Sequence, residues 1–152
     1  MSDSIDPVAG KQVGDPASAL ASHPALGTLR EAAEGLLFPS ETDAPLVPFF
    51  WADADAVPLT SERLLALAQV PVGTPVKSVS LATFFRPATK EEDWHNAEEQ
   101  AEVKRFQGLV ATIKATLGRP QVFRVGETNM DVYVVGVADG GYMGLQTRVV
   151  ET

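Results

Sequence analysis

The clearest pattern of apolar and polar residues lies in the last part of the chain. Three runs rich in valine and aromatic residues, Gln121–Val125, Asp131–Val137 and Gly144–Val150, are separated by short polar turns. β-Branched and aromatic residues in such runs are typical of strands, and turns this short join only antiparallel neighbours. We therefore expect an antiparallel sheet that continues almost to Glu151 and Thr152.

Helices are expected where apolar residues recur every three or four positions. Leu26–Leu37 has that spacing and is followed by Pro39, which disfavours α geometry in the residue before it. A second helix is expected to begin at Thr60, whose hydroxyl can cap the first turn. The longest helix is expected over Ala97–Leu117, where one apolar stripe runs through the segment.

Three further segments are assigned from weaker local patterns. Phe49–Ala52 reads as a short aromatic strand, and Pro48 places it at a sheet edge or a strand start. Val76–Phe85 alternates between apolar and polar residues, which indicates a strand. Thr89–Glu92 fits the capping-box pattern and predicts a helical region that carries Trp94 and His95.

The order of these elements predicts an α+β fold with a mainly antiparallel sheet covered by helices. A length of 152 residues suits one domain. Residues 1–25 are rich in proline, glycine and aspartate, so we expect a flexible N-terminal extension there and a single domain over residues 26–152.

The charge favours a protein partner over a nucleic acid. The formal net charge is −8, and acidic residues cluster between Lys90 and Arg105. Such a surface repels phosphate and would attract a basic protein, although acidity that only maintains solubility is the common case. The absence of cysteine suits a reducing compartment, and the acidic start without an apolar run predicts neither a signal peptide nor a membrane span.

A search for catalytic patterns points away from an enzyme. His23 and His95 are the only histidines, no cysteine is present, and no serine lies in a Gly-x-Ser-x-Gly motif. Glu127 and Asp131 flank a turn and would suit calcium only weakly. By exclusion we expect a binding protein without a cofactor or metal of its own; a carboxylate-dependent hydrolase is the remaining alternative.

Two features are candidates for binding. Trp94 lies among acidic residues, where it is either an interface anchor or a ring folded back onto the core. The last strand is either a simple edge strand or a rigid end that enters another molecule, presenting the Glu151 side chain and the α-carboxylate of Thr152. Pattern alone favours the edge strand.

Several blocks, in order from about Leu29 to the last residue, resemble the nuclease A inhibitor family. These proteins bind and block a sugar-non-specific, metal-dependent nuclease. The blocks are Glu34-Gly-Leu-Leu-Phe-Pro-Ser-Glu41, Asp93-Trp94 leading to Phe106-Gln107, Pro120-Gln-Val-Phe-Arg-Val-Gly-Glu127, Asp131-Val-Tyr-Val-Val-Gly136 and the terminal Val149-Val-Glu-Thr152.

The resemblance implies an α/β/α sandwich and a cytoplasmic, monomeric inhibitor that forms a one-to-one complex with a basic, metal-containing endonuclease. Glu41 matches the loop acid that pairs with an active-site arginine of the nuclease. Thr152 matches the terminal residue whose carboxylate engages the nuclease-bound metal, with Glu151 beside it. Trp94 and Glu92 match a further contact segment, although Glu92 stands where the family has glutamine. The alternative is an interaction module of the same fold with a different basic partner.

Overall fold

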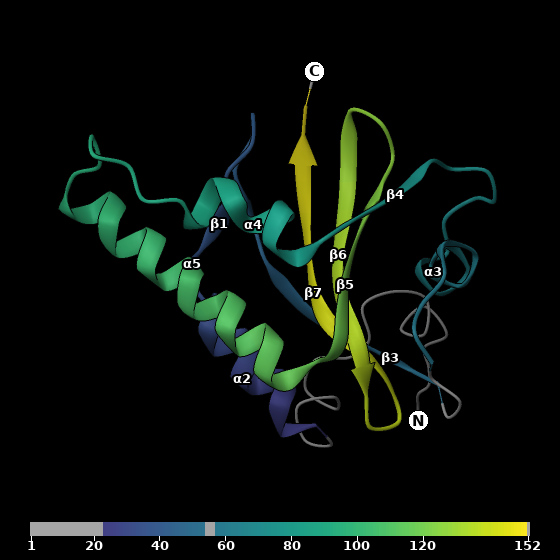
Figure 1. Ribbon diagram of the computed structural model, residues 1–152. Coiled ribbons are helices and arrows are strands. Elements are labelled where there is room, and N and C mark those ends of the chain that lie inside the picture. The colour runs from purple at the N-terminus through teal and green to yellow at the C-terminus, as the bar shows by residue number, and fades with distance from the viewer. Residues whose placement is uncertain (1–22, 54–56, 152) are drawn as a thin grey trace, which may run out of the picture.

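The computed structural model describes residues 23–53 and 57–151, with four helices and seven strands in these ranges (Figure 1). Most of the predicted extension, residues 1–22, lies outside the described residues, as do residues 54–56 and Thr152. In chain order the elements are α2 (Pro24–Ala33), β1 (Leu37–Phe38), β2 (Ala44–Pro45), β3 (Val47–Ala52), α3 (Ser61–Ala68), β4 (Val76–Val79), α4 (Leu81–Thr89), α5 (Ala97–Thr116), β5 (Gly118–Val125), β6 (Asn129–Ala138) and β7 (Gly141–Val150).

A five-stranded antiparallel sheet with the order β3-β7-β6-β5-β4 forms the centre of the molecule. The strands β5, β6 and β7 are consecutive neighbours, which confirms the predicted meander. β7 pairs with β3 on one side and β6 on the other, so the expectation that the last strand is an edge strand is wrong. β3 is an edge, in agreement with Pro48, because proline has no N–H to donate to a further strand.

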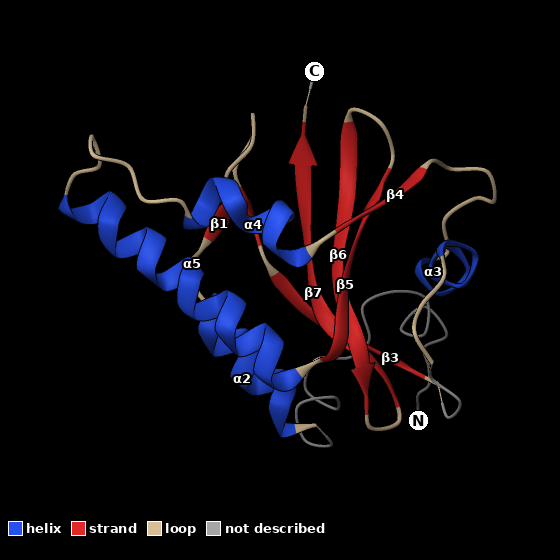
Figure 2. Cartoon of the chain, in the orientation of Figure 1, coloured by secondary structure: helices blue, strands red, loops and turns tan. Residues whose placement is uncertain are grey.

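Helices cover both faces of the sheet and give the predicted α/β/α sandwich (Figure 2). β6 shows why its sequence is almost continuously apolar. Val132 and Val134 pack against α2, α4 and α5, whereas Tyr133 and Val135 pack on the opposite face with α3, since successive strand residues point to opposite sides. Burial on both faces makes β6 the centre of the core.

The first helix is shorter than its apolar spacing predicts. α2 ends at Ala33 rather than continuing to Leu37, and Gly35 follows with a φ of +78°, a conformation that glycine adopts without steric cost. The guanidinium of Arg105 donates a hydrogen bond of 2.6 Å to the carbonyl oxygen of Glu34. This contact holds the turned chain against α5 and lets Leu37 begin β1.

The strand predicted over Val76–Phe85 is correct only for its first half. β4 ends at Val79, and α4 begins after Ser80, whose hydroxyl accepts a hydrogen bond of 3.1 Å from the N–H of Thr83. A serine cap satisfies an N–H group that the first helical turn leaves without an intrahelical partner. The prediction was wrong because Val79 and Leu81 continue the alternation across this cap.

The long helix is confirmed, but the region before it is not helical. α5 begins after Asn96, and Asn96 and Glu99 form a reciprocal capping box with bonds of 2.8 and 2.9 Å. The predicted box at Thr89 is wrong, because Thr89 ends α4 and its hydroxyl donates to the carbonyl oxygen of Phe85. Residues 90–96 therefore form a loop between α4 and α5.

Candidate functional site

One edge of the molecule brings together the loop 39–43, the turn 126–128 and the end of β7 at Val150 and Glu151; we call it the terminal edge (Figure 1). The N–H of Glu41 donates a hydrogen bond of 3.2 Å to the carbonyl oxygen of Val150. A groove of about 520 Å³ lies beside this contact, and its lining includes Glu41, Glu151 and Arg124. Two of the predicted binding acids therefore share one groove.

The loop 39–43 is positioned by a buried aromatic residue at its start. Phe38 is only 3% exposed and stacks on Phe84 with ring centroids 4.3 Å apart. The hydroxyl of Ser40 then donates to the carbonyl oxygen of Thr42 at 2.8 Å and accepts from its N–H, which closes a tight turn. The anchor and the turn together leave Glu41 exposed next to the end of β7.

Glu151 is tied to the sheet on the side opposite this loop. Its N–H donates to the carbonyl oxygen of Thr128 at 2.9 Å, and its carboxylate accepts a hydrogen bond of 2.6 Å from the guanidinium of Arg124. Arg124 belongs to β5, so its side chain reaches across β6 to make this ion pair. Charge-assisted bonds of this kind are stronger than neutral ones. Thr152 itself lies outside the described residues.

Trp94 projects from the loop 90–96 and is 70% exposed, which excludes the alternative in which its ring folds back onto the core. The ring contacts His95 edge-on, with centroids 4.4 Å apart. His95 and Glu92 close the loop through two hydrogen bonds: the N–H of Glu92 donates to His95 Nδ1 at 3.2 Å, and the N–H of His95 donates to the carbonyl oxygen of Glu92 at 3.1 Å. His95 is thus a loop residue and not the helix residue predicted.

The family model described as nuclease A inhibitor-like protein matches residues 23–152. The chain belongs to this family. The match confirms the family predicted from the sequence blocks. Comparison with curated proteins gives no match.

Within this member of the nuclease A inhibitor-like family, the predicted site residues form two groups. Glu41 and Glu151 line the groove at the terminal edge. Glu92 and Trp94 lie on the loop 90–96, which in Figure 1 is also on the upper side of the molecule but farther from the end of β7. Lys90 forms an ion pair of 3.5 Å with Glu92, so that acid is partly neutralised within its own loop.

Two residues of the terminal edge had no place in the sequence prediction. Ser40 accepts a hydrogen bond of 3.2 Å from the N–H of Val150, and Arg124 pairs with Glu151. The only sequence signal was compositional: Arg124 is a cation inside an apolar strand, and Ser40 follows a proline in a segment rich in turn residues. Neither signal indicates that Ser40 contacts Val150 or that Arg124 contacts Glu151.

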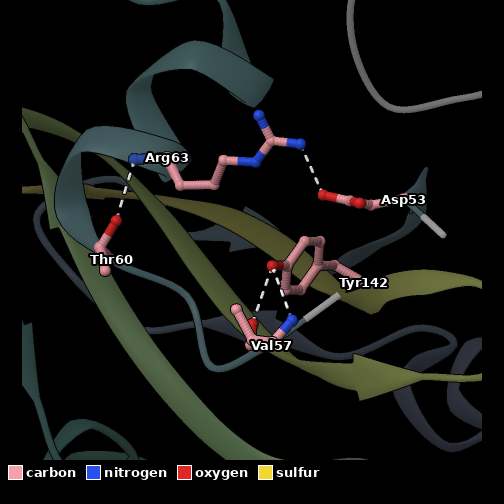
Figure 3. Close-up of polar contacts among 5 residues, drawn as sticks. All are labelled: Asp53, Val57, Thr60, Arg63 and Tyr142. Atoms are coloured by element: carbon pink, nitrogen blue, oxygen red, sulfur yellow. Dashed lines mark hydrogen bonds and ion pairs between the residues drawn. The ribbon is translucent and has the colours of Figure 1, made fainter. Parts of the chain in front are cut away.

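The opposite end of the sheet is closed by a polar cluster around Tyr142 (Figure 3). The Tyr142 hydroxyl donates to the carbonyl oxygen of Val57 at 2.8 Å and accepts from the N–H of Val57 at 3.2 Å. Arg63 forms an ion pair with Asp53, and the hydrogen bond to that carboxylate raises the pKa of the Arg63 guanidinium. These contacts attach Val57 to β7 and link Asp53 to α3, so the cluster has a structural role.

Among residues 23–53 and 57–151, no group of three or more histidine, aspartate or glutamate side chains is arranged to hold a metal ion. In the same ranges, no helix has the length and apolar character needed to cross a bilayer.

Proposed function

We propose that this protein inhibits a sugar-non-specific, metal-dependent DNA/RNA endonuclease, and that its terminal edge enters the nuclease active site. The observation that carries the proposal is the convergence of Glu41 and the end of β7 on one groove. The family match supports a nuclease inhibitor in general terms. In this proposal the protein acts as a monomer, in a one-to-one complex in the cytoplasm, and performs no catalysis.

The chemistry of the partner explains why acids are needed. A nuclease of this class binds an anionic phosphodiester with a metal ion and cationic side chains. The α-carboxylate of Thr152 would take the place of that phosphate at the metal, without a scissile bond. Glu41 would pair with a nuclease arginine beside it. A net charge of −8 would also steer the inhibitor toward a basic cleft.

The loop 90–96 would extend the contact surface beyond the groove. Trp94 offers a large exposed ring on a loop fixed by hydrogen bonds, and aromatic residues of this kind dominate interface energetics. Glu92 lies in the same loop, where it would add a second acidic contact.

The decisive experiment compares the intact protein with two variants in a plasmid-degradation assay against such a nuclease. The first variant lacks Glu151 and Thr152. The second carries one glycine appended after Thr152, which moves the α-carboxylate by about 3.8 Å and removes no side chain. Both are expected to inhibit more weakly. Equal potency of all three would exclude the carboxylate mechanism, and no inhibition by the intact protein would favour a different basic partner.

A further inference from the structure

The outer half of β7 lacks a regular strand partner on one side. β3 pairs with β7 only from Ala52↔Gly141 to Val47↔Gln146, so residues 147–150 extend past the end of β3. An exposed strand edge leaves N–H and C=O groups unpaired. Here both groups of Val150 are satisfied by the loop 39–43: its N–H donates to the Ser40 hydroxyl at 3.2 Å, and its carbonyl oxygen accepts from the N–H of Glu41 at 3.2 Å.

The other side of the same segment is held by the turn 126–128 and by Arg124 of β5. The N–H of Glu151 donates to Thr128 at 2.9 Å, and its carboxylate pairs with Arg124 at 2.6 Å. Val149 is buried against the helices, and strand alternation turns Glu151 toward the same face, where Arg124 also lies. The Arg124 side chain is 21% exposed and that of Glu151 is 57% exposed, so the pair lies at the rim of the groove.

We propose that Ser40 and Arg124 are positioning residues that fix the end of β7 before the partner arrives, and that Glu151 acts through Arg124 and not by touching the nuclease. This inference rests on the proposed function. A terminal segment that had to become ordered on binding would weaken affinity by about tenfold for each residue fixed. Clamping the segment from both sides removes that cost for Val150 and Glu151.

Ser40→Ala tests the first clamp, and Ser40→Thr restores the hydroxyl. Ser78→Ala, at an exposed position of β4, is the control. Amide hydrogen exchange in the free protein should become about fivefold faster at Val150 in Ser40→Ala, as expected when the Val150 N–H loses its hydrogen bond to the Ser40 hydroxyl. The association rate constant with a sugar-non-specific, metal-dependent nuclease should fall by a similar factor, because the competent population is smaller. The thermal midpoint should change little, and Ser40→Thr should recover both values.

A double-mutant cycle tests the second clamp. Arg124→Gln and Glu151→Gln should each raise the dissociation constant by about fivefold, and the double variant should be no weaker than either single one. Lys77→Gln is the control. Lys77 lies opposite Arg124 on β4 and takes part in none of the ion pairs among the described residues, so its substitution should have little effect on the dissociation constant. If Arg124→Gln does not fold, Arg124→Lys replaces it in the cycle, because lysine keeps the positive charge.

The outcomes separate this inference from the function on which it rests. Absence of inhibition by the intact protein would remove the proposed function, and the positioning role with it. Intact inhibition together with faster exchange at Val150 but unchanged association would overturn the role of Ser40 alone. A further loss of affinity when Glu151→Gln is added to Arg124→Gln would show that Glu151 contacts the nuclease directly.

Discussion

Asp131 and Arg148 lie directly opposite each other on β6 and β7 and are joined by an ion pair of 3.0 Å. Tyr133 lies two residues along β6 on the same face and is 6% exposed. Burial, reinforced by the negative charge of Asp131 and opposed by Arg148, raises the pKa of Tyr133 to about 12. The phenol is therefore held in its neutral form by the folded state.

Tyr133 should make the protein less stable in strong alkali. Below pH 10 both states keep the proton; between pH 10 and 12 the unfolded chain releases it while the folded chain does not. The free energy of unfolding should fall by about 2 kcal/mol across this window because of Tyr133. Urea denaturation at several pH values should show this fall, and Tyr133→Phe should lack it. Parallel curves for the two proteins would contradict the assignment.

Glu41 should matter for binding and Asp43, two residues later on the same loop, should not. Both side chains are exposed, so neither Glu41→Gln nor Asp43→Asn should change stability by more than about 0.5 kcal/mol. If Glu41 pairs with a nuclease arginine, its substitution should raise the dissociation constant by about tenfold or more, with a smaller effect at high salt. Binding measured at two salt concentrations checks this. Equal effects of the two substitutions on the dissociation constant would mean that Glu41 contributes only through the overall negative charge and not through a specific ion pair.

Trp94→Ala should weaken the complex without weakening the fold. The side chain is 70% exposed, so the free energy of unfolding should stay within about 0.5 kcal/mol of the original. As an interface anchor, Trp94 should contribute about 2 kcal/mol to binding, or roughly 30-fold in the dissociation constant. Val72→Ala is the control, because Val72 is 96% exposed on the loop after α3. Unchanged affinity of the Trp94 variant would place the loop 90–96 outside the interface.

Ser80→Ala should destabilise the protein by about 1 kcal/mol, because it removes the hydroxyl that caps α4. Ser78→Ala, two residues earlier on β4, should change stability by less than 0.5 kcal/mol. Chemical denaturation of the two variants measures the difference. A similar small effect at both positions would mean that the cap contributes nothing to the start of α4.

Local patterns predicted the meander β5-β6-β7 because its runs of valine and aromatic residues are separated by short polar turns, and the helix α5 because one apolar stripe runs along it. They failed at α4 although Leu81, Phe84, Phe85 and Ala88 have helical spacing and are buried. Pro87 within that segment argues against a helix, and the alternation from β4 runs into its start. The strand alternation and the helical spacing overlap at the start of α4. The sequence alone cannot separate them, because it does not show which side chains are buried.

The place of β7 and the clamps of the terminal edge were beyond local inference. β3 pairs with β7 through contacts between distant parts of the chain, and the sequence of neither strand indicates which strand it pairs with. The bond between Ser40 and Val150 likewise joins residues 110 positions apart. The family blocks supplied Glu41, Glu92, Trp94, Glu151 and Thr152 as candidates. Only the three-dimensional arrangement shows that Arg124 holds Glu151 and that Ser40 holds the preceding residue, Val150.

The position of β7 between β3 and β6 also bears on the order in which the protein can be made. During synthesis, β1 can pair with β2, and β4, β5 and β6 can pair as they emerge, whereas β3 has no sheet neighbour until β7 follows. Contacts of such long range slow folding. The terminal edge would thus be the last part to assemble, because Glu41 has no contact with Val150 until β7 has been made.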